Sequence, residues 1–168
     1  MQASYYMQGF ILTCLCFFLL SCKTTSKQDR FSSYRDHIYN EEILLDYQDK
    51  WVSHGPYADK VTFCEAEIIL KCIDNEIFWF SIQKENLELS VNERWHWQEK
   101  SFRVVSIIDN YPFNSANGKA YVIEARSLNG DSLLEARFIY SVKVGLVVAQ
   151  YFNKGPYAYL ILNSAKGF

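Results

Sequence analysis

The sequence predicts a mainly β protein. We expect an antiparallel meander that forms a curved sheet or a small barrel of about eight strands, with one short N-terminal helix. Aromatic residues make up 17% of the chain, mostly Tyr and Phe, and these residues favour strands. From residue 60 onward, apolar runs of strand length alternate with short polar breaks. Asn129-Gly130 is also the residue pair that a two-residue hairpin turn prefers.

The chain is expected to have three parts. Residues 1–21 are predicted to be a signal peptide, residues 22–34 a tether, and residues 35–168 a single β-rich domain. The stretch KTTSKQDRFSS, directly after Cys22, is polar and holds few residues that could enter a core. The remaining length suits one domain, which would bury about two thirds of its unfolded surface.

The short helix is predicted between residues 40 and 55. Asn40 can cap its N-terminus, and two glutamates follow in the first turn. Apolar residues then recur every four positions, at Ile43, Tyr47 and Trp51. Gly55-Pro56 ends the segment. We expect this helix to pack on a sheet or to close one end of a barrel.

The strands are expected to follow one another along the rest of the chain. Their predicted spans are 60–72, 76–84, 86–92, 101–109, 119–128, 131–142, 144–152 and 157–164. The span 144–152 is apolar on both faces, which is typical of a strand that is covered on two sides.

The hairpin at Asn129-Gly130 can be given a register. A two-residue turn places apolar residues opposite each other in three pairs: Ala125 with Leu134, Ile123 with Ala136, and Tyr121 with Phe138. These six are predicted to face inward, and four charged residues to face outward: Glu124, Arg126, Glu135 and Arg137. The register opposes Glu124 to Glu135, and the diagonal arginines offset that repulsion.

Two cysteines, Cys64 and Cys72, lie within the predicted strand 60–72 and on its apolar face. In a straight strand they would be about 26 Å apart, whereas a disulfide needs Cα atoms within about 7 Å. We therefore predict two buried free thiols. An intramolecular bridge is the alternative, and it would require that residues 60–72 are not one strand.

An uncharged run, FILTCLCFFLL, occupies residues 10–20. As a helix it would be about 16 Å long, too short for a bilayer core of about 30 Å, but typical of the apolar region of a secretory signal. The residues Leu19-Leu20-Ser21-Cys22 resemble the lipobox of bacterial lipoproteins. The resemblance implies that the Cys22 thiol is lipidated and that cleavage occurs before it. No Lys or Arg precedes the apolar run. The alternatives are an ordinary signal peptide cleaved nearby, or a buried core segment.

The lipobox resemblance also implies a location. The protein is expected to be held in the cell envelope by its lipid anchor. Lys23, rather than Asp, follows Cys22, which by resemblance to enteric sorting implies the outer membrane, facing the periplasm. The formal net charge of −2 and the absence of a basic run argue against a nucleic-acid partner.

Motifs typical of catalysis are absent from the sequence. The histidines, His37, His54 and His96, do not occur at metal-ligand spacing, and there is no GxSxG, HExxH or glycine-rich phosphate loop. We therefore expect no catalytic residue, no metal site and no cofactor. Trp95 and Trp97 share one side of an extended segment, and form either an exposed aromatic contact surface or part of the core.

These observations predict a non-enzymatic, membrane-anchored envelope lipoprotein that binds an envelope protein or supports an assembly. The alternative is a carrier of a hydrophobic, lipid-like ligand in a barrel or half-barrel. The surplus of Phe, Tyr, Leu and Val favours that alternative.

Overall fold

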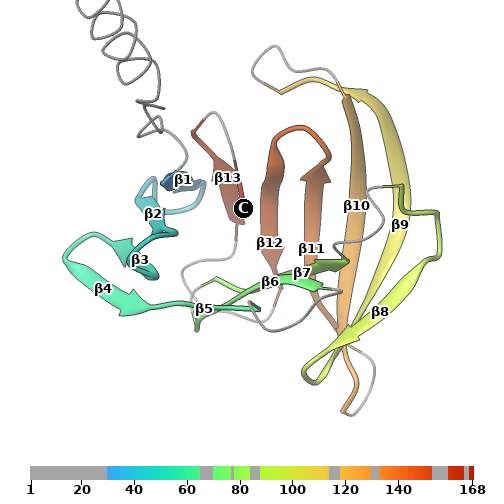
Figure 1. Ribbon diagram of the computed structural model, residues 1–168, viewed down its shortest axis with the longest axis horizontal. Helices are drawn as coiled ribbons and strands as arrows, with labels where there is room; N and C mark the ends of the chain where they lie inside the picture. Colours follow the sequence, from blue (N-terminus) through green and yellow to red (C-terminus); the bar gives the residue numbers. More distant parts are fainter. Residues whose placement is uncertain are drawn as a thin grey trace, which may run out of the picture.

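The computed structural model describes residues 30–64, 70–76, 78–83, 88–113, 118–129, 133–152, 159–164 and 167–168. These residues form two antiparallel sheets (Figure 1). The larger sheet contains β1 (Phe31–Asp36), β2 (Glu42–Asp46), β3 (Trp51–His54), β4 (Tyr57–Lys60), β8 (Arg94–Trp97), β9 (Lys100–Tyr111), β10 (Gly118–Ser127), β11 (Leu134–Ser141), β12 (Gly145–Tyr151) and β13 (Tyr159–Leu162). The smaller sheet contains β5 (Thr62–Phe63), β6 (Leu70–Asp74) and β7 (Phe80–Gln83).

The predicted fold class is confirmed in its main features. The large sheet is an antiparallel meander with ten strands, in the order β4-β3-β2-β1-β13-β12-β11-β10-β9-β8. Its two edges, β4 and β8, do not pair with each other, so the sheet is open and not a closed barrel. The smaller sheet has the order β5-β6-β7 and connects the two edges along the chain.

The first and last strands pair in the middle of the large sheet. β1 and β13 are antiparallel, with Tyr34 opposite Leu162. The Tyr34 hydroxyl donates to the carbonyl of Leu146 at 3.1 Å and accepts from the amide of Phe168 at 3.0 Å. β1 begins at Phe31, within the segment 22–34 that was predicted to be a tether. Residues 1–29, with the predicted signal peptide and Cys22, lie outside the described residues.

The short helix predicted between residues 40 and 55 is wrong. This segment forms β2 and β3, and the buried side chains alternate with period two, at Ile43, Leu45, Val52 and His54. The residues spaced every four positions, which indicated a helix, do not share one face, because Ile43 points inward whereas Trp51 points outward. The apolar residues of this segment fit both a helical and a strand spacing. The segment is a pair of strands because β2 pairs with β1 on one side and with β3 on the other.

A turn between β2 and β3 separates the two strands. The Asp46 carboxylate accepts hydrogen bonds from the backbone amides of Gln48 at 2.9 Å and Asp49 at 3.1 Å. Lys50 completes the turn with φ of 57°, in the left-handed region. An Asp that bonds backbone amides two and three residues ahead is typical of a turn.

The prediction of two free thiols is also wrong. Cys64 and Cys72 form a disulfide, with their Cα atoms 5.1 Å apart. The prediction assumed one straight strand from 60 to 72, but β5 and β6 are separate strands that pair antiparallel. The amide of Cys64 donates to the carbonyl of Cys72 at 3.4 Å, which continues this pairing to the bridge.

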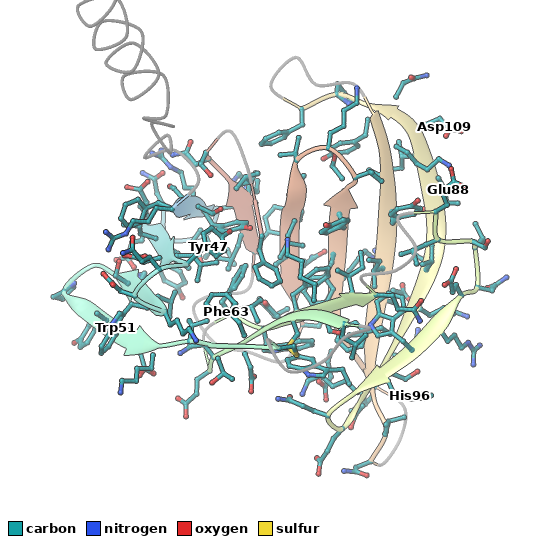
Figure 2. The ribbon with its side chains drawn as sticks, viewed as in Figure 1. Tyr47, Trp51, Phe63, Glu88, His96 and Asp109 are labelled. Atoms are coloured by element: carbon teal, nitrogen blue, oxygen red, sulfur yellow. A yellow bond between two sulfur atoms is a disulfide. The ribbon has the colours of Figure 1, made fainter. Side chains whose placement is uncertain are left out.

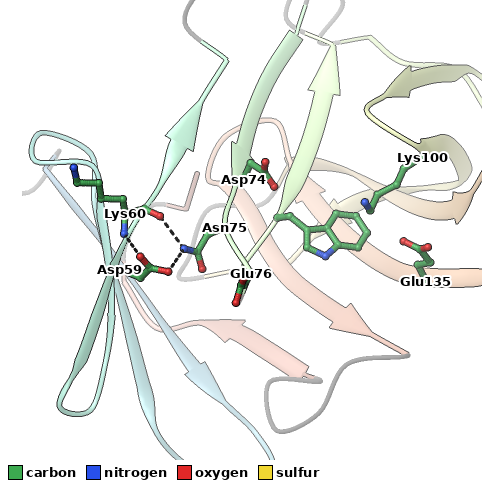
Figure 3. Close-up of a pocket in the computed structure, with 8 residues that line it drawn as sticks. Asp59, Lys60, Asp74, Asn75, Glu76, Lys100 and Glu135 are labelled. Carbon is green, nitrogen blue, oxygen red and sulfur yellow. Dashed lines mark hydrogen bonds between the residues drawn. The ribbon is translucent and has the colours of Figure 1, made fainter.

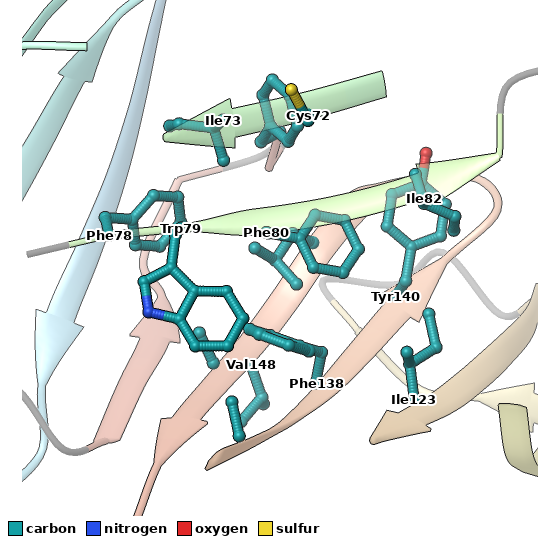
Figure 4. Close-up of a cluster of buried hydrophobic side chains, with 14 of the residues drawn as sticks. Cys72, Ile73, Phe78, Trp79, Phe80, Ile82, Ile123, Phe138, Tyr140 and Val148 are labelled. Carbon is teal, nitrogen blue, oxygen red and sulfur yellow. The ribbon is translucent and has the colours of Figure 1, made fainter. Parts of the chain in front are cut away.

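The core lies between the two sheets. Trp79, directly before β7, and Phe80, its first residue, point onto the inner face of the large sheet (Figure 4). The Trp79 ring lies 5.1 Å from that of Tyr151 and 5.5 Å from that of Phe138, and Phe80 lies 4.9 Å from Phe138. The Tyr151 hydroxyl accepts from the Trp79 amide at 3.0 Å and donates to the Trp79 carbonyl at 2.8 Å.

The hairpin of β10 and β11 has the predicted faces but a different register. Three apolar pairs are found: Ala125 with Ala136, Ile123 with Phe138, and Tyr121 with Tyr140. Each partner on β11 is two residues further along than predicted, so the inward residues stay inward. Tyr121, Ile123, Ala125, Ala136 and Phe138 are fully buried as expected, and Leu134 is half-buried. The connection is longer than two residues, and a bulge follows Ala125.

The remaining strand predictions are confirmed for β9 to β13, with ends shifted by a few residues. β12 is buried on both faces, as its composition predicted. The predicted strand 86–92 is wrong over the residues described there, because Glu88–Asn92 contain no strand and β8 begins at Arg94. The predicted strand 76–84 is shortened to β7.

The bridge between Cys64 and Cys72 can be tested by unfolding. A bridge that closes a loop of this size stabilises a domain by about 2–3 kcal/mol. We expect the Cys64→Ser/Cys72→Ser variant to lose this amount in denaturant titrations. Reduced wild-type protein should match the variant, and alkylation of unfolded, unreduced protein should leave both cysteines unlabelled. Labelling of both without reductant would contradict the bridge.

Candidate functional site

An arginine cluster lies on the outer face of β8 to β11. Its members are Arg94, Arg103, Arg126 and Arg137; the last three surround Glu124, and Arg94 lies beside Arg103. Three of these arginines and Glu124 form one row across neighbouring strands. Arg94 is opposite Arg103, Arg103 is opposite Glu124, and Glu124 is opposite Arg137. Arg126 lies two residues beyond Glu124 on β10 and therefore on the same face.

Glu124 holds three of the arginines together. Its Oε1 accepts a hydrogen bond from Nη2 of Arg137 at 2.7 Å, and its Oε2 accepts one from Nη2 of Arg126 at 3.2 Å. Nη2 of Arg103 is 3.6 Å from the same Oε2. Glu124 was predicted to face outward and exposed. It does point outward, but only 7% of its surface is exposed, because the arginines lie over it.

The electrostatics of Glu124 follow from these contacts. Burial alone raises the pKa of the Glu124 carboxyl, but the hydrogen bonds from Arg137 and Arg126 and their positive charges outweigh burial. The pKa of Glu124 is therefore lowered, and the side chain is a carboxylate at neutral pH.

The cluster carries an excess of positive charge at the surface. Three guanidinium groups meet one carboxylate, and the side chains of Arg103, Arg126 and Arg137 are 36%, 42% and 46% exposed. Arg94, opposite Arg103 on the neighbouring strand, adds a fourth exposed arginine. A guanidinium has five N–H donors, and Glu124 accepts one hydrogen bond from Arg137. Planar guanidinium groups held in place are well suited to bind carboxylates and phosphates in pairs of hydrogen bonds.

A second feature is a polar cavity of about 420 Å³ between the two sheets (Figure 3). It is lined by Asp59, Lys60, Asp74, Asn75, Glu76, Trp79, Lys100 and Glu135. The Nζ of Lys100 lies 4.8 Å from the centre of the Trp79 ring. The amide of Asn75 donates to the carbonyl of Lys60 at 2.8 Å, and Gln98 donates to Asp74 at 2.7 Å.

The chemistry available in this cavity is limited. Its lysines lie among its carboxylates, and the Lys100 ammonium covers the aromatic face of Trp79. Throughout the described part of the chain, no group of three or more His, Cys, Asp or Glu side chains is placed to hold a metal ion. The cavity therefore offers a polar, charged surface.

The candidate aromatic surface of Trp95 and Trp97 is wrong. Both side chains point into the core and are 5% and 7% exposed. The Trp95 ring stacks on Phe102 at 5.5 Å, and Trp97 lies 6.3 Å from the same ring. Alternation along β8 instead turns Arg94 and His96 outward. The other candidate, Cys22, lies outside the described residues.

The arginine cluster was missed because of the hairpin register. With a two-residue turn, Glu124 would be opposite Glu135, and the two negative charges would repel each other. With the observed shift of two residues, Glu124 opposes Arg137, and the charges match. The mismatch in the predicted pair was the signal in the sequence that could have revealed the longer connection.

Comparisons with known proteins give no further assignment. No protein-family model, no curated protein and no solved structure matches the chain. Over the residues that the structure describes, there is no helix with the length and apolar character needed to cross a membrane.

Replacing Glu124 tests the electrostatics of the cluster. Glu124→Gln removes the acceptor of charge-assisted hydrogen bonds, and we expect the free energy of unfolding at pH 7 to fall by about 2 kcal/mol. The pKa of Glu124 is lowered on folding, so its contribution is complete above its ordinary pKa of 4.5 and is lost as the pH falls through the lower, folded-state pKa.

Wild type and Glu124→Gln should therefore converge in stability in acid. Glu99→Gln is the matched control, because Glu99 is an exposed carboxylate in the turn between β8 and β9. An equal loss for Glu99→Gln, or a difference between wild type and Glu124→Gln that persists in strong acid, would contradict the role given to Glu124.

Proposed function

We propose that the protein is a non-enzymatic, lipid-anchored protein of the bacterial cell envelope that binds an anionic partner through its arginine cluster. The observation that carries this proposal is the arrangement of three arginines around one buried glutamate, with Arg94 as a fourth beside Arg103. A single ion pair would satisfy the carboxylate of Glu124. The additional arginines place positive charge on the surface, where a partner can reach it.

The envelope location rests on two independent features. The residues Leu19-Leu20-Ser21-Cys22 resemble a lipobox, which implies a lipid at Cys22. The bridge between Cys64 and Cys72 is typical of proteins that fold in an oxidising, extracytoplasmic compartment. Lys23 favours the outer membrane, with the domain in the periplasm. Together these features support export followed by anchoring.

Binding at the outer surface is favoured over carriage of a hydrophobic ligand. The inner face of the large sheet is in contact with Trp79, Phe80 and their neighbours from the small sheet. These side chains take the place that a lipid would take in a half-barrel. The outer face of β8 to β11, in contrast, carries exposed charge.

The spacing of the cluster favours a partner with repeated negative charges. Arg94, Arg103 and Arg137 come from different strands of one sheet, and neighbouring strands lie about 4.8 Å apart. Carboxylate or phosphate groups along a chain or on a surface can contact several of these arginines at once, which raises affinity beyond that of one ion pair.

Binding of a polyphosphate chain tests this surface. In nonionic detergent, we expect wild-type protein to bind polyphosphate with an affinity that falls as salt is added. Arg94→Gln and Arg137→Gln should each weaken binding roughly three- to tenfold, as measured by calorimetry, because each removes a charged contact.

The control for this experiment is Arg35→Gln. Arg35 is an exposed arginine on the outer face of β1, outside the cluster. Arg35→Gln removes the same charge as the other two substitutions. Because Arg35 lies outside the cluster, we expect this variant to bind polyphosphate with unchanged affinity. Equal weakening by all three substitutions would indicate a nonspecific effect of net charge and would contradict the proposed site, as would an absence of binding by the wild type.

A further inference from the structure

An exposed apolar stripe crosses the outer face of β1 to β3. Its members are Phe31, Leu44 and Trp51, which are 36%, 37% and 38% exposed. The three are on one face, because Tyr34, Ile43 and Val52 on the same strands point into the core. They come from three adjacent strands, and Phe31 and Trp51 both flank Asp46 in the register.

The surroundings of this stripe combine aromatic rings, basic side chains and carboxylates, among them Asp49 and Glu42. Lys60 is directly opposite Trp51, and the Arg30 guanidinium lies 4.8 Å from the centre of the Phe31 ring. Arg30 also donates to Asp46 at 2.6 Å, so the acid within the stripe is paired. Tryptophan and long basic side chains are the residues that favour the interface between bilayer and water.

The short stretch of chain between Cys22 and β1 limits how far this face can lie from a membrane that holds Cys22. Phe31 is separated from Cys22 by a stretch that spans at most about 30 Å even when fully extended. A domain of this size is roughly 35–40 Å across. If acyl chains hold Cys22 in a membrane, the start of β1 must stay close to that membrane, and the neighbouring face of the domain is the one that can reach the headgroups.

We propose that the outer face of β1 to β3, with Phe31, Leu44 and Trp51, lies against the lipid headgroups of the membrane in which Cys22 is anchored. This inference rests on the lipid anchor of the proposed function. It adds an orientation to that anchor. Trp51 lies at one end of the molecule, and His96, beside the arginine cluster, lies at the other (Figure 2). The cluster is thereby directed away from the membrane.

Tryptophan fluorescence can test this contact in the intact protein. Trp79, Trp95 and Trp97 are at most 7% exposed, so Trp51 is the tryptophan that lipid can reach. We expect vesicles of phosphatidylethanolamine and phosphatidylglycerol with brominated acyl chains to quench the wild-type, lipidated protein. Trp51→Tyr should abolish that quenching. Phe31→Ser/Leu44→Ser should reduce it by about half or more, because less apolar surface then enters the interface.

Leu133→Ser is the matched control for these substitutions. Leu133 is an apolar residue, 58% exposed, next to β11 and far from the stripe in the sheet order. This variant should be quenched as strongly as the wild type. Quenching lowered equally by Leu133→Ser would contradict a specific membrane face.

The remaining outcomes distinguish a failure of the proposed membrane contact from a failure of the proposed lipid anchor. Protein that does not float with the vesicles at all would refute the lipid anchor itself. Protein that floats, while Trp51 is unquenched by brominated lipid and open to acrylamide, would refute the membrane contact and leave the anchor intact. Trp51 that is shielded from both quenchers would also refute it and would indicate that a second copy of the chain covers the face.

Discussion

The packing of Trp79 and Phe80 onto Phe138 and Tyr151 is the interaction on which the rest of the structure depends. An open, curled sheet with ten strands exposes a wide apolar inner face, and water would destabilise it unless another layer covers it. The small sheet supplies that layer, and the bridge between Cys64 and Cys72 holds its β5–β6 pair together. With the inner face occupied in this way, the surfaces left for recognition lie on the outside.

The outer face of the large sheet is chemically divided. At the β1–β4 end it carries exposed apolar side chains. At the β8–β11 end it carries guanidinium groups arranged around Glu124. The pairing of β1 with β13 joins these ends into one sheet, so the proposed anchor at the N-terminus would set the direction of both surfaces. In the proposed function, the sheet separates the membrane from the anionic partner.

Features of the fold that depend on the local sequence pattern were predicted, whereas features that depend on contacts between distant parts of the chain were not. Alternation along β9 to β13 identified these strands and their inward faces, because one buried face imposes period two on the sequence. Residues 42–54 satisfied both helical and strand spacing, and only pairing with β1 resolved them. The hairpin register and the cysteine bridge depended on connections whose lengths the sequence did not reveal. The arginine cluster was missed for the same reason, since its charges meet only in the observed register.

Native mass spectrometry of the protein purified from membranes in mild detergent tests the central claim most directly, namely that the chain is anchored through Cys22 and has a core filled by its own side chains. We expect the mass of a chain that begins at Cys22, with covalently attached acyl groups and no further noncovalent ligand. A chain that begins elsewhere without acyl groups would contradict the anchor. A lipid-like molecule retained in a one-to-one ratio would contradict the filled core and would favour a carrier.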